Sequence, residues 1–305
     1  MCLPGCSGRH YWFSGASEEA QSIETLAWIL FAGAGVIWLI VMALAFFAMR
    51  SSGRSNTEKS ARRMILWGGF AFPTVVLAAL LGTGLLTLKS IVAERSDLTL
   101  EVEGEQWWWR VGYPGGVVTA NEVRLPRGRT AEILLTADDV IHSFWAPALG
   151  GKIDMIPGRE NRLTLTPTTV GNWGGLCAEY CGGAHAQMRF NVIVMEPDAF
   201  DAWLEDEAAP AQPESGPGLE AFLGEGCGAC HTIRGTEAQG LVGPDLTHFG
   251  ARTSLGAGIL ALDRDTLRHW ITHTDTLKPG VKMPAYPDIP TEELEDMIDY
   301  LLSLT

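Results

Sequence analysis

Charged side chains are missing from two long stretches of the 305-residue sequence. Residues 26–49 and 64–88 contain none, and each stretch exceeds the roughly 20 residues that a helix needs to cross the core of a bilayer. Helices buried in a globular core rarely run this long without a polar stripe, so that alternative is disfavoured. We therefore expect two membrane-spanning helices.

The loop between these stretches is basic, with Glu58 as its one acidic side chain against Arg50, Arg54, Lys59, Arg62 and Arg63. The positive-inside rule places such a loop in the cytoplasm, so both flanking parts of the chain are expected outside. Residues 96–305 carry a formal charge of −17, from 14 basic and 31 acidic side chains. This charge would attract a basic partner and argues against nucleic acid as a partner. The alternative is that the acidic side chains serve only solubility.

A disulfide framework is not indicated by the six cysteines, although an exported chain would allow one. Cys177 and Cys181 lie in a cluster with a His and a Met, and Cys227 and Cys230 directly precede a His. Cys2 and Cys6 have no obvious partner. Leu3-Pro-Gly-Cys6 resembles the end of a lipoprotein signal, but no apolar segment precedes it, and we favour an accidental match over a missing or processed signal.

The rest of the chain divides into two regions by composition. Short strand-like runs at residues 98–102, 131–136, 162–166 and 190–194, separated by Pro and Gly turns, predict a small antiparallel β-sandwich or barrel. A helical pattern follows, and its last helix has Thr291 as the expected N-cap and an apolar face formed by Leu294, Ile298 and Leu301. No internal repeat is present.

The expected organisation has five parts. They are an exported segment (1–25), two transmembrane helices with a cytoplasmic loop (26–95), the β-domain (96–206), a linker rich in Pro, Ala and Gly (207–217) and a mostly helical domain (218–305).

Twelve residues of the β-domain contain a dense set of metal ligands. The run from Cys177 through Cys181 and His185 to Met188 brings together two thiols, an imidazole and a thioether. Sulfur and imidazole ligands suit copper, and two Cys four apart on a tight loop could bridge two ions. Zinc is the alternative, although structural zinc sites seldom use Met. His142 is the best candidate for a second imidazole, although a lone His is often a core residue.

The helical domain opens with a motif for covalent haem. Cys227-Gly-Ala-Cys230-His231 supplies two thiols that add to the haem vinyl groups and an adjacent axial His. A Cys-x-x-Cys redox pair is the alternative, but no thioredoxin-like pattern surrounds the motif. Met283, in a loop beside a Pro, is the expected opposite axial ligand, and its weaker rivals are Met297, His248, His269 and His273.

Residues from about 20 to 205 resemble subunit II of the cytochrome c oxidases. The resemblance rests on the run from Cys177 to Met188, on His142-Ser-Phe-Trp and on Gly104-Glu-Gln-Trp-Trp-Trp109. It implies a cupredoxin-like sandwich and a binuclear copper centre, CuA, bridged by Cys177 and Cys181. The other ligands that it implies are His142, His185, Met188 and the Glu179 carbonyl.

The same resemblance assigns two further roles. The Glu179 side chain would reach a magnesium ion shared with the catalytic subunit, and Trp107 would be the electron-entry residue above the copper. Because alternate side chains of a strand face opposite ways, at least one of Trp107, Trp108 and Trp109 is expected at or near the surface, and an aromatic belt residue at the membrane is the alternative role. Residues 218–305, with Gly243-Pro-Asp-Leu246, are similar to a class I cytochrome c.

Together these resemblances imply an electron-entry subunit of a haem–copper oxidase in a bacterial inner membrane, with its copper and haem domains outside. It would pass electrons from a cytochrome c donor through haem c and CuA to haem in a partner subunit, for oxygen reduction coupled to proton translocation. Oxygen reduction belongs to the partner, since neither apolar stretch contains a His. The alternatives are the corresponding subunit of a nitric oxide reductase and a stand-alone membrane carrier.

One position departs from the family pattern. The family often carries a Glu shortly before the Pro of its second span, whereas this chain has Leu66 seven residues before Pro73. The route of proton uptake is therefore open.

Overall fold

The structure, a computed structural model, describes residues 8–50, 57–91 and 96–305. Cys2, Cys6 and Arg54 lie outside these ranges. The chain divides into one unit of residues Gln21–Glu94 and another of Met1–Ala20 with Arg95–Thr305, and each is described by itself.

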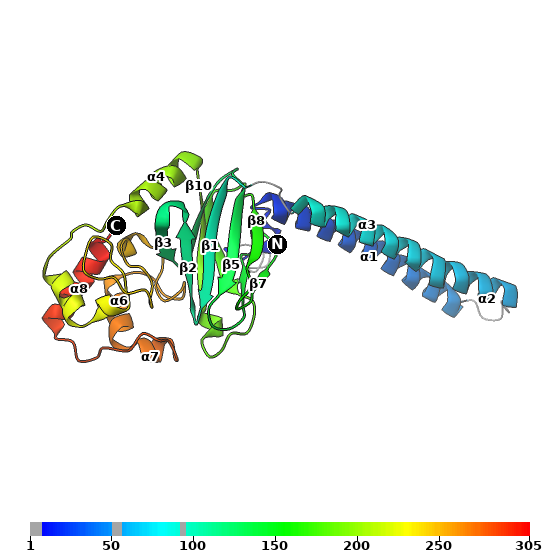
Figure 1. Ribbon diagram of the computed structural model, residues 1–305. Helices are drawn as coiled ribbons and strands as arrows, with labels where there is room; N and C mark the ends of the chain where they lie inside the picture. Colours follow the sequence, from blue (N-terminus) through cyan, green and yellow to red (C-terminus); the bar gives the residue numbers. More distant parts are fainter. Residues whose placement is uncertain (1–7, 51–56, 92–95) are drawn as a thin grey trace. The chain divides into compact units, whose positions relative to one another are not determined.

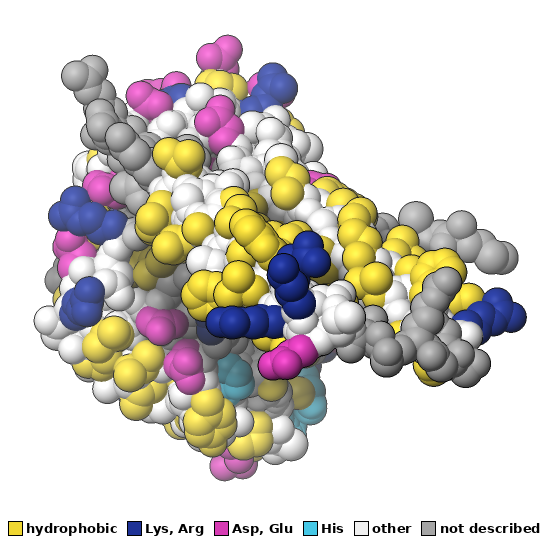
Figure 2. Space-filling model, turned by 90° about the vertical axis from the view of Figure 1, so that its right-hand side faces the viewer, with side chains coloured by type: hydrophobic (Ala, Val, Ile, Leu, Met, Phe, Trp, Pro, Cys, Tyr) yellow, Lys and Arg dark blue, Asp and Glu magenta, His cyan; other side chains and the backbone are white. Residues whose placement is uncertain are grey.

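The first unit is a pair of long helices (Figure 1). α1 (Glu18–Arg50) forms one arm, and α2 (Glu58–Met64), a π-helical segment (Ile65–Ala71) and α3 (Phe72–Ile91) form the other. Both arms are long and apolar enough to cross a membrane, and the most apolar part of each is unburied. Figure 2 shows hydrophobic side chains gathered on the face that this unit turns to the viewer. Helices of a globular core would have this part buried, so the exposure is consistent with the expected membrane spans.

The β-domain is a sandwich of two five-stranded sheets, ordered β3-β2-β1-β5-β8 and β4-β10-β9-β6-β7. Its strands are β1 (Leu98–Glu105), β2 (Trp108–Tyr113), β3 (Val117–Ala120), β4 (Glu122–Pro126), β5 (Ala131–Ala137), β6 (His142–Trp145), β7 (Ile153–Met155), β8 (Asn161–Leu165), β9 (Gly171–Cys177) and β10 (Arg189–Met195). The expected sandwich is confirmed, but β1 pairs with β5 and β10 with β4 in parallel, so the sheets are mixed. Strands that are not consecutive in the chain can pair in parallel through longer connections.

Alternating side chains build the core between the sheets. In β1 the side chains of Leu98, Leu100 and Val102 are buried while the intervening ones face outward. Three aromatic rings meet at the centre: Phe144 stacks on Phe190 with centroids 4.4 Å apart, and Trp109 meets Phe190 edge-on at 5.0 Å. This packing joins β2, β6 and β10 in the core of the sandwich.

The C-terminal part is helical and has its own apolar core. It contains α5 (Pro217–Gly224), α6 (Arg264–Thr272), α7 (Thr274–Leu277) and α8 (Thr291–Ser303), while α4 (Pro197–Ala208) leads from the sandwich toward it. Gly218 allows α5 to cross α8 closely, since a Cβ there would lie 2.2 Å from the Asp296 carbonyl oxygen. Five short 3-10 turns complete the described elements: Trp12–Ser14, Pro114–Gly116, His185–Gln187, Cys227–Ala229 and Phe249–Ala251.

The start of α8 differs by one residue from the expectation. Thr291 is the first helical residue, and Pro290 occupies the N-cap position without a side-chain cap. The fixed φ of a Pro allows it to precede the first helical residue. The predicted apolar face of α8 is confirmed, because Leu294, Ile298 and Leu301 are buried.

Candidate copper and haem sites

Two strand ends and one loop bring the predicted copper ligands together. His142 begins β6, Cys177 ends β9, and the loop that follows returns to β10 after Met188. Phe144 of β6 pairs with Cys177 of β9, and the Cys177 amide donates to the Met188 carbonyl at 2.9 Å. Backbone pairing therefore places the two ends of the loop beside the strand that carries the upstream histidine.

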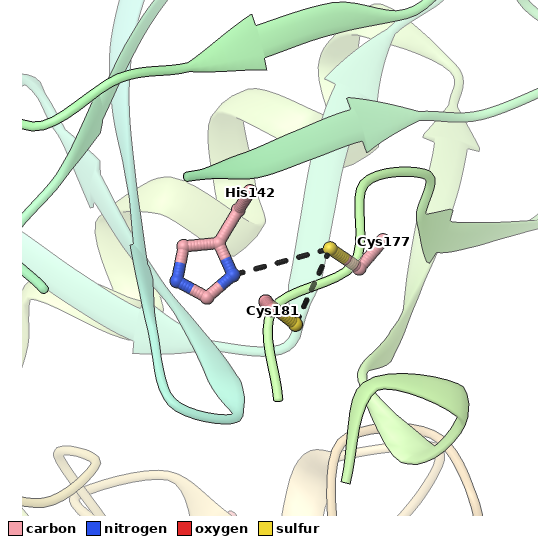
Figure 3. Close-up of side chains that lie close together, drawn as sticks. All are labelled: His142, Cys177 and Cys181. Atoms are coloured by element: carbon pink, nitrogen blue, oxygen red, sulfur yellow. Dashed lines mark hydrogen bonds between the residues drawn. The ribbon is translucent and has the colours of Figure 1, made fainter. Parts of the chain in front are cut away.

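Neighbouring donor atoms of this cluster lie 3.2–3.9 Å from one another. Cys177 Sγ is 3.7 Å from Cys181 Sγ, 3.9 Å from His142 Nδ1 and 3.2 Å from the Glu179 carbonyl oxygen. Cys181 Sγ is 3.5 Å from His185 Nδ1 and 3.8 Å from Met188 Sδ. Figure 3 shows the side chains of His142, Cys177 and Cys181 pointing toward one another.

These distances suit metal ions held between the donors. Donors on one tetrahedral ion, with bonds of about 2.0–2.3 Å, would lie roughly 3.3–3.8 Å apart. A disulfide between the two cysteines would need sulfurs about 2.05 Å apart, so their separation of 3.7 Å fits thiols that share metal ions. The sulfur-rich donor set with imidazoles and a thioether is that of a copper site rather than a zinc site.

Hydrogen bonds in the cluster favour a thiolate at Cys177. The hydrogen bond between the two sulfurs lowers the pKa of Cys177 to about 3 and raises the pKa of Cys181. Burial by itself would lower the pKa of His142, but its contacts with Cys177 and Asp139 raise it. The thiolate, not the thiol, is the form of cysteine that binds metal.

Asp139 orients the imidazole of His142, and the sequence reasoning missed it. Asp139 Oδ1 lies 2.9 Å from His142 Nε2, so the ring donates there and presents Nδ1 to Cys177. Its other oxygen accepts the Gln106 amide at 2.7 Å, which connects the histidine to the loop before Trp107. A carboxylate three residues before the expected ligand was the available signal.

The three consecutive tryptophans have different environments: Trp107 lies in the turn before β2, whereas Trp108 and Trp109 lie in the strand, and Trp108 is the expected one near the surface. Trp109 is fully buried in the sandwich core, whereas Trp108 is partly exposed and lies 4.7 Å below the Arg110 guanidinium. Trp107 is 8% exposed, and its indole Nε1 donates to the Cys181 carbonyl at 3.0 Å. Trp107 thus contacts the loop that carries the candidate copper ligands directly.

A large cavity in the same unit contains the haem motif. It has about 1350 Å³ of empty volume, its open mouth included, and its lining includes Cys227, Cys230, His231 and Met283 together with Trp107. Most of the other lining side chains are apolar, among them Phe222, Leu246, Phe249, Leu267, Ile271, Tyr286 and Leu301. An apolar cavity lined by two thiols and an imidazole fits a covalently attached haem.

His231 is held with one ring nitrogen free. Its Nδ1 donates to the Pro244 carbonyl at 2.8 Å, which leaves Nε2 for a ligand. Burial lowers the pKa of His231, which keeps the imidazole neutral and able to bind iron. Gly243 is needed at this contact, because a Cβ there would lie 2.6 Å from the imidazole ring.

The rival axial ligands lie in different places. His248 donates to the Ala209 carbonyl at 3.1 Å, and His269 and His273 are exposed with their rings 4.7 Å apart; none of the three lines the cavity. Met297 lines it from α8 but is 1% exposed within the helical core. Met283 lines it from a loop, which leaves its thioether the freer of the two.

Comparison with known proteins gives the same division of the chain. Residues 115–196 match the family model of the cytochrome c oxidase subunit II periplasmic domain, and residues 216–305 match the cytochrome c model. Cytochrome c oxidase subunit 2 of Alkalihalophilus pseudofirmus is 39% identical over 241 residues, which cover 77% of this chain and 68% of that protein.

Two further similarities extend the comparison. The same subunit of Bacillus sp. strain PS3 is 31% identical over 84% of this chain and 79% of its own length. The crystal structure of the periplasmic domain of subunit II from Bradyrhizobium japonicum aligns with 38% of this chain and 96% of that one, at 33% identity and a TM-score of 0.37. The relatives are oxidase subunits, which does not favour a nitric oxide reductase.

Sequence comparison and structure give the same two domains. The first is a sandwich with a cluster of sulfur and imidazole donors, and the second is a helical domain around a Cys-x-x-Cys-His motif. The chain therefore belongs to the cytochrome c oxidase subunit II family and is the electron-entry subunit of a haem–copper oxidase, extended by a cytochrome c domain.

Proposed function

We propose that the chain accepts electrons from a c-type cytochrome at residues 218–305 and delivers them through the loop from Cys177 to Met188 to haem in the catalytic subunit. One observation carries this proposal. Trp107 donates to the Cys181 carbonyl and also lines the cavity that contains Cys227, Cys230 and His231. A single side chain thus contacts both candidate redox sites.

At the copper site, Cys177 and Cys181 would bridge two ions in a binuclear CuA centre. His142 and His185 would each bind one ion through Nδ1, and Met188 and the Glu179 carbonyl would complete the set. The distances of 3.2–3.9 Å among these donors support the assignment. Copper would supply one-electron redox chemistry, while the sandwich holds the donors in place and excludes water from the buried cysteines.

At the haem site, Cys227 and Cys230 would form the covalent links, and His231 and Met283 would be the axial ligands. Haem c would supply the second one-electron centre. The chain's own contribution is to fix the His231 imidazole through Pro244 and to surround the porphyrin with apolar side chains. A thioether ligand favours a high reduction potential, which suits onward transfer to copper.

The exposed carboxylate of Glu179 supports a role at the boundary with the catalytic subunit. Its carbonyl faces Cys177 while its side chain is exposed, where Oε1 accepts the Tyr180 amide at 3.2 Å. The side chain would therefore be available to a magnesium ion shared with the partner.

The apolar helices support an anchor in the bacterial inner membrane. We propose that the residue ranges 26–49 and 64–88 span it, with the basic loop on the cytoplasmic side and both redox sites outside. A carrier without a catalytic partner would need only one such span.

Two matched variants of the full chain in its oxidase complex test the proposal. We expect Cys181→Ser to abolish the copper absorption and paramagnetic signals while the haem c band remains, because one bridging sulfur is lost. Cys230→Ser should reduce the covalently bound haem while the copper signals remain, because one thioether link is lost. Oxygen uptake driven by cytochrome c should fall steeply in both variants.

The proposal would be wrong if elemental analysis of the pure complex found no copper beyond that of the catalytic subunit, or if Cys181→Ser kept the copper signal of this chain. Uptake of nitric oxide rather than oxygen by the complex would instead favour the reductase alternative.

A further inference from the structure

Lys278 is a buried lysine between the two redox sites. Lys278 is 2% exposed, whereas Lys152 and Lys282 are exposed to solvent. It follows α7 directly and stands five positions before Met283. Burial lowers the pKa of Lys278 to about 7. An ammonium in such a place has a free-energy cost that its contacts must offset.

The contacts of Lys278 join the helical domain to the sandwich. Nζ donates to the Trp107 carbonyl at 2.7 Å and to the Gly256 carbonyl at 3.1 Å. The first acceptor belongs to the sandwich and the second to the helical domain. Within the described part of the chain, no carboxylate lies within ion-pair distance of Nζ. The side chain therefore acts through two carbonyl oxygens rather than through a salt bridge.

The backbone of both domains also approaches the ring of Trp107. A Cβ at Gly182, in the loop from Cys177 to Met188 (the copper loop), would lie 3.0 Å from Cζ2 of the indole. A Cβ at Gly280, in the loop that leads to Met283, would lie 3.1 Å from Cη2. The ring is thus enclosed by the two loops that carry the candidate ligands, and the carbonyl of the same residue is bound by Lys278.

Further hydrogen bonds fix the same boundary. Gln187, next to Met188, donates to the Leu277 carbonyl at 2.9 Å. Glu122 is 2% exposed and accepts the Thr253 amide at 2.6 Å, and the Arg189 amide donates to the Ala257 carbonyl at 3.0 Å. Polar groups buried with partners on both sides of a boundary indicate a specific contact rather than a loose tether.

We propose that Lys278 is a positioning residue: it locks the haem-binding domain onto the backbone of Trp107, so that electrons cross between the domains through one fixed contact. The proposal rests on the electron-entry function given above. A role confined to the helical domain would need only the Gly256 contact, yet the shorter bond goes to Trp107.

The test uses the full chain in the oxidase complex with Lys278→Met, which keeps the length of the side chain but removes its donors. Lys152→Met is the matched control, because it removes the same charge from an exposed site. Lys278→Gln, which keeps a shorter donor, should give an intermediate effect. All variants should retain the copper and haem c spectra, because no ligand is changed.

Two readouts measure the contact. Hydrogen exchange of the amides at residues 253–258 and 280–281 should quicken by about tenfold or more in Lys278→Met, because the boundary opens more often. After flash reduction of haem c, the electron transfer to copper should slow by at least about tenfold, since a small displacement of the reacting groups has a large effect on rate.

Unchanged exchange and an unchanged transfer rate in Lys278→Met would overturn the proposal. An equal slowing in Lys152→Met would also overturn it, because charge and not position would then be the cause. Missing copper or haem c spectra in the unaltered chain would contradict the electron-entry function instead, while the exchange measurement would still test the role of Lys278.

Discussion

Gly104 leaves room for the imidazole of His142. A Cβ added at this position of β1 would lie 2.8 Å from Cδ2 of His142 and 3.2 Å from Cβ of His142. His142 is fully buried and is held from its other side by Asp139. The ring therefore has little freedom to move away, and the identity of residue 104 determines where Nδ1 points.

We expect Gly104→Ala to weaken copper binding by about tenfold or more while the sandwich stays folded, because the added methyl group displaces the ring from its sulfur partner. Copper titration of the metal-depleted complex, read from the copper absorption, measures the effect. Gly112→Ala is the control, since the nearest atom to its new methyl group would lie at an ordinary 3.7 Å. Equal copper affinity in both variants would remove Gly104 from this role.

The candidate copper ligands could be proposed from sequence because they lie within one loop, plus one upstream histidine, and the structure brings His142, Cys177 and Cys181 together. The supporting residues were not. Asp139 and Lys278 act through contacts that depend on how β6, the copper loop and the helical domain meet, and neither stands in a recognisable motif. The burial of Trp107 likewise depends on the domain that covers it, which no local pattern encodes.

The pairing of β9 with β10 determines the shape beneath the copper loop. Gly175 of β9 lies opposite Phe190 of β10, and a Cβ at Gly175 would lie 2.2 Å from the phenylalanine ring. The ring therefore covers the glycine and stacks on Phe144 of β6. Residues of three strands, β6, β9 and β10, therefore pack together at the Phe190 ring.

Gly175→Ala should accordingly destabilise the sandwich by about 1–3 kcal/mol, because the methyl group forces Phe190 out of its packed position. Denaturant unfolding followed by the loss of copper absorption measures the change in midpoint. Gly151→Ala serves for comparison, since nothing lies within 4 Å of the place that its added methyl group would take. A midpoint equal to that of Gly151→Ala would show that the core adapts without cost.

Strand positions could be predicted, whereas their partners could not. The runs at 98–102, 131–136, 162–166 and 190–194 all fall within β1, β5, β8 and β10, give or take one residue at their ends. The parallel pairs β1 with β5 and β10 with β4 join strands far apart in sequence, so local periodicity could not reveal them. The position of Thr291 was wrong by one residue for a similar reason, since helix ends depend on local backbone geometry.

The two parts of the sequence on either side of residue 95 carry net charges of opposite sign. Residues 96–305 carry a formal charge of −17, while residues 1–95 carry +3. An acidic field of this size speeds the approach of a basic partner at low salt by about tenfold or more. The field thus favours a basic cytochrome as the electron donor.

Raising the ionic strength should therefore slow the second-order reduction of this chain by a basic cytochrome c, and should have little effect with a neutral small reductant. Stopped-flow measurements of haem c reduction over a series of salt concentrations give the slope. A rate that stayed constant or rose with salt for the basic donor would exclude electrostatic steering.

We propose that Cys177 and Cys181 join a pair of copper ions. Paramagnetic resonance of the oxidised full chain in its complex tests it most directly, together with the copper content per chain. We predict two copper ions in this chain, in addition to the copper of the catalytic subunit, and a hyperfine pattern in which one unpaired electron is shared equally between two copper nuclei. One copper ion in this chain, with the pattern of a single nucleus, would rule out the binuclear centre.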